Sequence, residues 1–527
     1  MWARTLSVAL QLSAAAAALP PLPVPPSQIV RGNDFVGAPA AGNQLHPKVQ
    51  FQPPASLMHG DAGNTGSTDS AGPLGQDPDV KSALQILGVM LWGPGGTLSG
   101  GRADVSNILQ PRIGLGAYDP ATLEVLAEWF PDDPDEYLNL GYMELRLEDN
   151  SLLVSGASGR LYVVQRTDGN DGTSFELTRE VDIAGSLSPG ETLLNNLFDT
   201  EGNIWFTTGT LPSTPLGPQS SATIGYVEPD GTVHTLHLPD QIIENGIALN
   251  GTTAYVVTGP LNGTTTTTGY VWAFTTDSSG GDGGRTGWRA LYDAGTHQKP
   301  GALTRGGGAT PALLGGDYVA TTDNADGRIN LLILHQEPRE DPDDQVLCAV
   351  PLFGEGASSN DVRPTVHFDG ERYGVVIQNG YAVPPMLDHA QFLLNVNGAW
   401  NNMTGMPGGI VRVDVIPGEG CEVRWESDIK IKSVPALSTK TGILYGYVQE
   451  EEFAVDGTYV WYFIAVDWES GELLWMKRAG AGGSYNDNAW PGSVGEGRFY
   501  QSLMLGVVWI EDGSETYYEG HSYARNP

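Results

Sequence analysis

The stretch WYFIAVDWESGELLWMKRAG, residues 461–480, has the pattern of two β-strands joined by a tight turn. An apolar strand ends at Asp467, Gly471 closes the turn, and the second strand carries Trp475. Asp and Gly favour a turn here, because an Asp side chain accepts hydrogen bonds from nearby main-chain amides and Gly tolerates a positive φ. The stretch therefore predicts one hairpin of an all-β protein.

Hairpins of this kind recur along the chain in two alternating classes. The first class begins at residues 142, 196, 245, 309, 363, 434 and 490. The second class lies between them, at 112–129, 160–181, 224–238, 269–292, 329–350, 409–427 and 461–478. Two hairpins per repeat form a four-stranded sheet, and a regular series of such sheets predicts a β-propeller.

The order of the hairpins predicts how the ring closes. The chain opens with a second-class hairpin and ends with a first-class hairpin, so we expect the last blade to be shared by both termini, which leaves no exposed sheet edge. This gives seven four-stranded blades. Residues 83–92 and 506–512 can add further strands, so eight blades, like six, stay compatible with the pattern.

The N-terminal residues predict secretion. Arg4 precedes an apolar run that ends in small residues, which is typical of a signal peptide over residues 1–18 and is too short to span a membrane. Residues 19–80 are rich in Pro, Gly and Ser, and we expect an extended, partly disordered arm that wraps the domain. Residues 81–527 form the single propeller domain.

The composition argues against two classes of partner and agrees with an oxidising compartment. A formal net charge of −35 disfavours nucleic acid and anionic membrane surfaces, which both require a positive face. The two cysteines, Cys348 and Cys421, predict one disulfide. Sequons at Asn250, Asn262 and Asn402 predict glycosylation of solvent-facing loops.

The stretch FIAVDWESGELLW, residues 463–475, resembles a repeat of the quinoprotein-like propellers. That resemblance implies pyrroloquinoline quinone with a Ca²⁺ ion and the oxidation of alcohols. The chain lacks the adjacent cysteine pair that many such enzymes show. The pattern itself has a generic physical reason, since the turn closes the hairpin and the aromatic side chain packs between blades. A quinone-dependent dehydrogenase is therefore kept as an alternative function.

A second resemblance lies in NGIALNGTTAYVV and DTEGNIWFTT, which are similar to lactonase and strictosidine-synthase-like propellers. These hold an axial divalent metal with Glu, Asn and Asp. Asn196, Asn245 and Asn360 precede predicted inner strands, and Glu244 is adjacent to one of them. Such asparagines also serve as structural caps, and the sequence shows no convergent set of carboxylates, so we predict no metal site. A metal-dependent, lactonase-like hydrolase is the second alternative.

A third resemblance covers residues 290–512, with KPGALTRGGGATPALLGGDYVATTDNADG and NGYAVPP among its marks. The chain is similar there to secreted fungal propellers that include the hetero-Diels–Alderases of tropolone–sesquiterpenoid biosynthesis. This resemblance implies a cofactor-free enzyme that joins an o-quinone methide to an apolar polyene. Such a cycloaddition requires a dry pocket and hydrogen-bond donors to the quinone-methide oxygen.

The candidate site residues lie on loops or on the approaches to inner strands. Expected oxyanion donors are His297, Lys299 and Tyr381; expected substrate contacts are Asn245, Asn324, Asn360, Asn379, Trp400, Tyr485, Asn488 and Trp490. The insertion 378–406 is apolar for a loop, with Met386, Phe392, Trp400 and Met403, and is a candidate lid. The leading prediction is thus a hetero-Diels–Alderase, and the alternative from another class is a secreted propeller that binds a ligand without catalysis.

Overall fold

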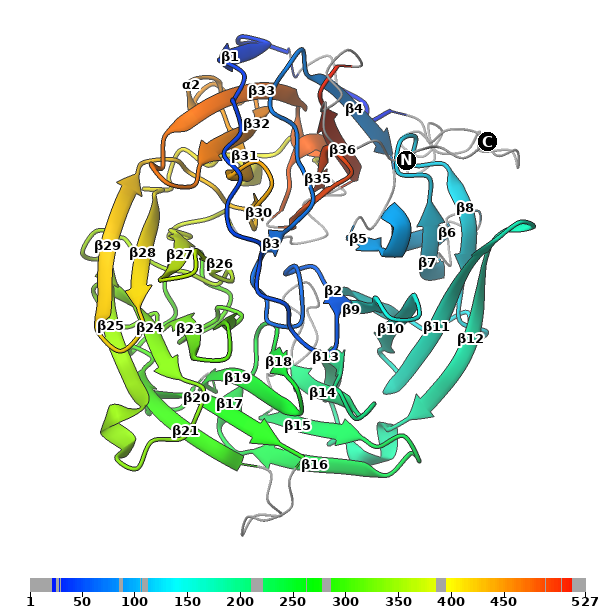
Figure 1. Ribbon diagram of the computed structural model, residues 1–527, viewed down its shortest axis with the longest axis vertical. Coiled ribbons are helices and arrows are strands. Elements are labelled where there is room, and N and C mark those ends of the chain that lie inside the picture. The colour runs from blue at the N-terminus through cyan, green and yellow to red at the C-terminus, as the bar shows by residue number, and fades with distance from the viewer. Residues whose placement is uncertain are drawn as a thin grey trace.

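Eight β-sheets form a closed ring around a central axis (Figure 1). The computed structural model describes residues 21–24, 28, 30–84, 89–104, 106, 112–209, 221–261, 263–276, 286–384, 395–488, 490–503 and 505–513. Within each blade the first strand lies nearest the axis and the fourth lies on the outer rim (Figure 1). The protein is therefore an all-β propeller, with eight blades rather than the expected seven.

The strands follow one another from blade to blade in chain order. Blade 1 contains β5 (Met90–Gly93), β6 (Thr97–Asp104), β7 (Arg112–Tyr118) and β8 (Val125–Trp129), and blade 2 contains β9 (Leu138–Arg146), β10 (Ser151–Gly156), β11 (Arg160–Gly169) and β12 (Gly172–Asp182). Blade 3 contains β13 (Thr192–Phe198), β14 (Ile204–Gly209), β15 (Ala222–Val227) and β16 (Val233–Leu238). Blade 4 contains β17 (Gln241–Ile242), β18 (Ala248–Asn250), β19 (Thr253–Pro260), β20 (Thr268–Thr275) and β21 (Thr286–Asp293). In blade 4, β17 and β18 both pair with β19 and together form the innermost strand.

The second half of the ring repeats the same order. Blade 5 contains β22 (Ala312–Leu314), β23 (Tyr318–Thr322), β24 (Ile329–His335) and β25 (Val346–Leu352), and blade 6 contains β26 (Thr365–Phe368), β27 (Tyr373–Gln378), β28 (Ile410–Ile416) and β29 (Gly420–Ser427). Blade 7 contains β30 (Ala436–Ser438), β31 (Ile443–Gln449), β32 (Val460–Asp467) and β33 (Leu473–Ala481). Blade 8 contains β34 (Gly492–Gly495), β35 (Arg498–Ser502), β36 (Gly506–Glu511) and β4 (Asp79–Leu84). Short helices lie in connections: η1 (Pro94–Gly96), η2 (Ala184–Ser186), η3 (Pro342–Gln345), η4 (Ala399–Asn401), α2 (Glu451–Ala454) and η5 (Gly483–Tyr485).

The expected count was wrong at the place where the ring closes. All fourteen predicted hairpins form, but the first and the last belong to different blades. The hairpin of β5 and β6 completes blade 1, and β4 pairs with β36 to complete blade 8, which therefore joins the strand that follows the arm to the last strand of the described chain. The β5–β6 hairpin is glycine-rich, with Gly95 and Gly96 at positive φ in its turn, and its strands contain one β-branched residue, Thr97, so the sequence signal for a strand is weak.

The hairpin of residues 461–480 has the expected structure. The Asp467 carboxylate accepts hydrogen bonds from the amide and hydroxyl of Ser470, and Gly471 has a φ of +74°. Trp468 is fully buried and packs against Arg412 of blade 6, whose guanidinium carbon lies 4.8 Å from the ring centroid and whose Nη1 donates to the Trp468 carbonyl. An aromatic side chain thus joins neighbouring blades, and the motif reports blade architecture.

The arm preceding β4 runs through the middle of the ring (Figure 1). Its first strand, β1 (Phe35–Gly37), extends the outer edge of blade 7, while β2 (Ala55–Ser56) pairs with β9 and β3 (Ser67–Thr68) pairs in parallel with β30. Between β2 and β3 the arm accepts main-chain hydrogen bonds from the innermost strands of blades 4, 5 and 6 and from blade 7, at Leu249, Leu313, Val366 and Leu437. The arm is therefore an extra strand shared by several blades and fills the axis.

One disulfide joins two blades at the rim. Cys348 on β25 and Cys421 on β29 are bonded, with their Cα atoms 6.2 Å apart, which confirms the predicted pairing. No helix among the described residues is long and apolar enough to cross a bilayer. The predicted signal peptide, residues 1–18, lies outside the described residues.

Two of the three predicted glycosylation sites, Asn250 and Asn402, lie within the described residues. Asn250 ends β18 and Asn402 follows η4; both are half-buried, and their amides donate to Gln336 and to the Ala454 carbonyl. Asn262 lies outside the described residues. Glycosylation itself stays a prediction.

Candidate functional site

The predicted site residues lie at one face of the ring. Strand direction alternates within a blade, so the connections between second and third strands share a face with the connections between blades. Ten of the eleven candidates lie on such connections, namely His297, Lys299, Asn324, Asn360, Asn379, Tyr381, Trp400, Tyr485, Asn488 and Trp490. Asn245 lies between β17 and β18, where the innermost strand of blade 4 is interrupted. We call this side the loop face.

Four of these side chains converge on one loop, residues 357–361, which leads into blade 6. Lys299 Nζ donates to the Ser358 carbonyl at 2.9 Å, and Asn379 Nδ2 donates to the Ala357 carbonyl at 2.9 Å. Asn324 Nδ2 donates to the carbonyl of Asn360 at 2.9 Å, and Asn245 Nδ2 donates to the carbonyl of Asp361 at 2.6 Å. Asn360 itself donates to the Gln378 carbonyl. These residues hold the loop by binding its main chain.

The remaining candidates do not join this group. His297 is 68% exposed at its side chain and faces Asp326 at 3.4 Å. Tyr381 is half-buried, and its main-chain amide donates to Asn379. Their expected role as donors stays a prediction.

The candidates on blade 8 and on the insertion lie elsewhere on the loop face. Tyr485 is buried near Ser82, Asn488 is buried with a positive φ, and Trp490 packs beside the core of blades 1 and 2. Trp400 is half-buried and its indole donates to the Asn395 carbonyl.

Part of the expected lid can be compared with the structure. Met403 is 2% exposed and packs in the core with Tyr447 and Trp461, so this part of the insertion covers the blade core. Met386 and Phe392 lie outside the described residues. The lid as a whole stays a prediction.

The sequence did not reveal the acid pair formed by Glu244 and Asp361. A methyl group built on Gly308 would lie 2.3 Å from Glu244 Oε1 and 2.7 Å from Asp361 Oδ1, so the two oxygens are no more than about 5 Å apart. Asp361 accepts hydrogen bonds from the Leu303 amide at 2.7 Å and from Asn324 Nδ2 at 3.0 Å. Neither oxygen of Glu244 has a partner in good hydrogen-bond geometry among the described residues, although Glu244 is only 6% exposed; the main-chain amide of Thr304 makes at most a weak contact with it.

Burial dominates the electrostatics of the pair. It raises the pKa of Glu244 well above the usual value, the nearby Asp361 carboxylate adds to this, and the main-chain amide of Thr304 acts in the opposite direction. Burial raises the pKa of Asp361 to about 6, against the effect of its hydrogen bonds from Leu303 and Asn324. No Lys, Arg or His among the described residues forms an ion pair with either carboxylate.

Lys299 is the buried cation of the same loop cluster. It is 6% exposed, and burial lowers its pKa, while the carboxylates of Asp323, Asp326 and Glu355 act in the opposite direction. Asp323 is held by Asn330 and by the amide of Ala325, so it belongs to the structure of its own turn. Lys299 therefore stabilises the 357–361 loop through Ser358 and does not neutralise the acid pair.

The tip of the arm reaches the acid pair through a short network. His59 Nε2 lies 3.1 Å from the Thr310 hydroxyl, which donates to Asn245 Oδ1 at 2.7 Å. The Tyr142 hydroxyl donates to the same oxygen at 2.7 Å. Burial, aided by the charge of Arg363, lowers the pKa of His59 to about 3, so the imidazole is neutral at neutral pH.

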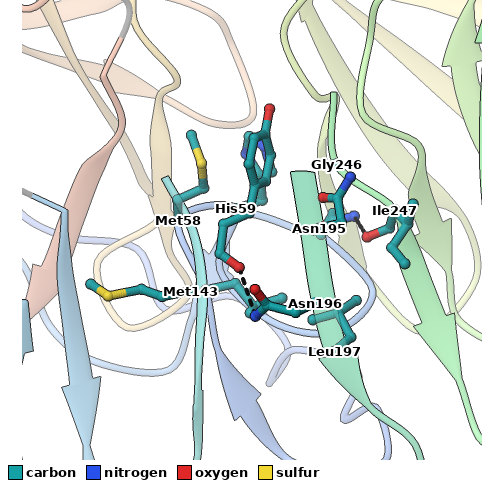
Figure 2. A pocket seen from close by; sticks show the side chains of 11 residues that line it. Met58, His59, Met143, Asn195, Asn196, Leu197, Gly246 and Ile247 are labelled. Carbon is teal, nitrogen blue, oxygen red and sulfur yellow. Dashed lines mark hydrogen bonds between the residues drawn. The ribbon is translucent and has the colours of Figure 1, made fainter. Parts of the chain in front are cut away.

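A small cavity of about 20 Å³ adjoins this network (Figure 2). It is lined by the arm tip, by blades 2 and 3 and by the start of β18, through Leu57, Met58, His59, Asn64, Tyr142, Met143, Asn195, Asn196, Leu197, Gly246 and Ile247. The cavity is of the size of one water molecule, which needs at least about 10–15 Å³.

The donor set of the acid pair suits a hard cation. No group of three or more His, Cys, Asp or Glu that could hold a metal occurs among the described residues. Ca²⁺ also accepts amide, carbonyl and water oxygens, and two carboxylates whose oxygens lie within about 5 Å can share one ion with ligand distances of about 2.3–2.6 Å. The buried, unpartnered oxygens of Glu244 are the observation that fits such an ion.

Comparisons with known proteins agree on the fold. No family model matches the chain. An uncharacterized protein from Archaeoglobus fulgidus is 29% identical over 246 residues, which are 42% of this chain and 45% of that protein, so the chain matches less than half of this relative's length. The crystal structure of the quinohemoprotein alcohol dehydrogenase from Comamonas testosteroni matches with a TM-score of 0.51 at 10% identity. The match covers 86% of this chain and 79% of that chain.

A second dehydrogenase of the same kind gives a weaker match. The quinohemoprotein alcohol dehydrogenase ADHIIG from Pseudomonas putida HK5 has a TM-score of 0.47 at 9% identity, with 88% of this chain and 81% of that chain covered. At these identities the likeness concerns the fold alone. The protein therefore has a β-propeller fold similar to that of the Comamonas testosteroni dehydrogenase, and the resemblance to hetero-Diels–Alderases stays a prediction.

Proposed function

We propose that this protein is an enzyme that binds a divalent cation, preferentially Ca²⁺, between Glu244 and Asp361 and hydrolyses a small ester or lactone at the loop face. The observation that carries the proposal is the Glu244 carboxyl group, which is buried without a hydrogen-bond partner beside a second carboxylate. A buried charge without a partner is costly, so such a pair either keeps a proton or binds a cation.

The surroundings of the pair favour the cation. Asp361 is held on one side by the Leu303 amide and on the other by Asn324, so its position is fixed. Glu244 is free to accept a ligand at both oxygens. Gly308 leaves space where any side chain would collide with both carboxylates, which is the role expected of a residue at a small binding site.

The chain supplies the remaining parts of a hydrolytic site. A bound divalent cation polarises a carbonyl oxygen as a Lewis acid and lowers the pKa of water. Asn245, Asn324 and Lys299 keep the loop that carries Asp361 in one position through its main-chain carbonyls. Lys299, with its pKa lowered by burial, is the nearest predicted donor to this loop.

The other candidate functions fit the described residues less well. A quinone cofactor would require a flat stacking surface on the axis, and the arm crosses the middle of the ring there, hydrogen-bonded to the innermost strands. A hetero-Diels–Alderase requires an apolar pocket for two substrates, and its expected lid, residues 378–406, is described only in part. Cycloaddition and ligand binding without catalysis stay predictions, and both differ from the proposal in requiring no cation.

Cation binding tests the proposal directly. We expect calorimetry with CaCl₂ on protein treated with a chelator to give one site, and Glu244→Gln to abolish it, because the neutral amide removes the free carboxylate. Glu371→Gln is the matched control, since Glu371 is exposed on the opposite end of blade 6 and its side chain has no role in the site. A panel of small esters and lactones, with and without Ca²⁺, then tests the reaction.

Two results would overturn the proposal. Stoichiometric Ca²⁺ binding that Glu244→Gln leaves intact would remove the site. Turnover of a quinone methide with a polyene at the same rate in chelator and in Ca²⁺ would establish the cation-independent cycloaddition instead.

A further inference from the structure

His59, at the tip of the N-terminal arm, has a proton arrangement that can be deduced from its neighbours. Asn245 Nδ2 faces the Asp361 carbonyl and Asn245 Oδ1 accepts from the amide of Gly246 at 3.0 Å, so the two main-chain groups fix the orientation of the Asn245 amide. Thr310 must then donate its only hydroxyl proton to Asn245 Oδ1. The neighbouring Nε2 of His59 is therefore the donor to Thr310, and its proton lies on Nε2.

This tautomer leaves His59 Nδ1 as an acceptor, and Nδ1 has no partner among the described residues. Asn196 Oδ1 is a second buried acceptor without a partner among the described residues. Its identity as the oxygen follows from Asn196 Nδ2, which donates to the carbonyls of Tyr142 and Leu153. Both residues line the cavity of about 20 Å³ (Figure 2). One water molecule fits this volume and can donate one hydrogen bond to each acceptor.

We propose that His59 is a positioning residue of the acid-pair site, held as a fixed Nε2–H donor by one buried water that it shares with Asn196. From His59 the hydrogen bonds run to Thr310, then to Asn245, and from Asn245 Nδ2 to the main chain at Asp361. The arm thus orders the loop that presents a cation ligand. The inference concerns the geometry of the site and rests on the proposed function only in its expected effect on Ca²⁺ affinity.

Two substitutions separate positioning from simple packing. His59→Gln keeps a nitrogen donor at about the place of Nε2, whereas His59→Phe keeps the ring beside Tyr142, whose centroid lies 6.2 Å away, and removes both nitrogens. We expect His59→Phe to weaken Ca²⁺ binding about tenfold, which corresponds to the loss of about one net hydrogen bond, and His59→Gln to restore it. Calorimetry with CaCl₂ measures both.

Two further measurements do not depend on the cation. Long-range ¹H–¹⁵N correlation spectra of protein labelled at histidine, with His59 assigned from His59→Gln, should show a protonated Nε2 and an unprotonated Nδ1. Hydrogen exchange of peptides covering 243–247 and 357–361 should speed up in His59→Phe, while peptides from blades 1 and 8 should stay unchanged. Local exchange is the readout that a general loss of stability would not produce.

The outcomes distinguish the two proposals. If the wild-type protein binds no Ca²⁺, the proposed function fails, while the tautomer and the local exchange still decide the role of His59. A proton on Nδ1, an unchanged exchange rate at 357–361 in His59→Phe, or equal acceleration in all blades would overturn the positioning role.

Discussion

Replacing Glu244 with glutamine is expected to stabilise the cation-free protein at neutral pH, although it removes a candidate ligand. The reason is the burial of the carboxyl group beside Asp361, which raises the pKa of Glu244 well above 4.5. A group whose folded-state pKa is raised binds its proton more tightly in the folded state than in the unfolded chain. Its stabilising effect is complete below the unfolded pKa and is lost as the pH rises.

The size of the effect follows from the two protonation states. While Glu244 keeps its proton in the folded protein and loses it on unfolding, each pH unit above 4.5 lowers the free energy of unfolding by about 1.4 kcal/mol. The loss continues for as long as the folded protein keeps this proton, and it ends once the pH passes the raised pKa of Glu244. For a chain of 527 residues, about 1.4 kcal/mol per pH unit corresponds to about 1 °C per pH unit in the midpoint of thermal unfolding.

Asp361 makes its own contribution to the pH dependence of stability in both wild type and Glu244→Gln. Its pKa of about 6 predicts a further loss of stability as the pH rises toward 6 and no further loss from this group above that pH. The Glu244→Gln protein keeps only this contribution. The free energy of unfolding of the wild type should therefore continue to fall above pH 6, whereas that of Glu244→Gln should no longer change with pH.

Thermal unfolding in chelator, measured from pH 4.5 to 8, tests the expectation. Glutamine loses no hydrogen bond at this position, since neither oxygen of Glu244 has a partner among the described residues. Glu371→Gln makes the same chemical change at an exposed position and should run parallel to wild type. Parallel curves for wild type and Glu244→Gln across this range would refute the argument, because they would mean that Glu244 ionises in the folded protein as it does in water.

Three further predictions concern the fold and the site. Reducing the bond between Cys348 and Cys421 should lower the free energy of unfolding by about 4 kcal/mol on the chain-entropy model for a separation of 73 residues, visible as a lower thermal midpoint in reductant. Gly308→Ala should abolish Ca²⁺ binding, because its methyl group collides with the acid pair, while Gly316→Ala, with nothing within 4 Å, should bind as wild type in calorimetry. Asn64→Ala should destabilise the protein by about 2 kcal/mol in denaturant unfolding, because it leaves two buried main-chain carbonyls of neighbouring blades without their donor.

The propeller could be predicted because its signal is local. Each hairpin carries its own alternation and its own turn, so all fourteen were found without knowledge of their neighbours. The eighth blade was missed because β4 reads DVKSAL and is half-exposed, so no apolar alternation marks it as the outermost strand of blade 8. Its pairing with β36 is a contact between distant parts of the chain, which periodicity does not report.

The acid pair could be predicted only in part. Asn245 and Asn360 were expected just before inner strands, where the structure places them, and each has an acidic neighbour, Glu244 and Asp361. The signal that was available is an Asn beside an acidic residue, a few residues before β18 in blade 4 and before β26 in blade 6. The contribution of His59 was not foreseeable, because it depends on the path of the arm through the axis, and a Pro- and Gly-rich segment carries no periodicity that specifies a path.

The path of the arm has a consequence for biosynthesis. The ribosome makes the arm first, yet Asp69 accepts a hydrogen bond from Thr439, 370 residues later in the chain. At about 5–20 residues per second, the arm emerges roughly 20–70 seconds before its partner on blade 7 exists. Closure of blade 8 waits longer still, since β4 pairs with β36. The axis and blade 8 can therefore be completed only near the end of translation, and until then the nascent chain carries strand segments whose partners have not yet been made.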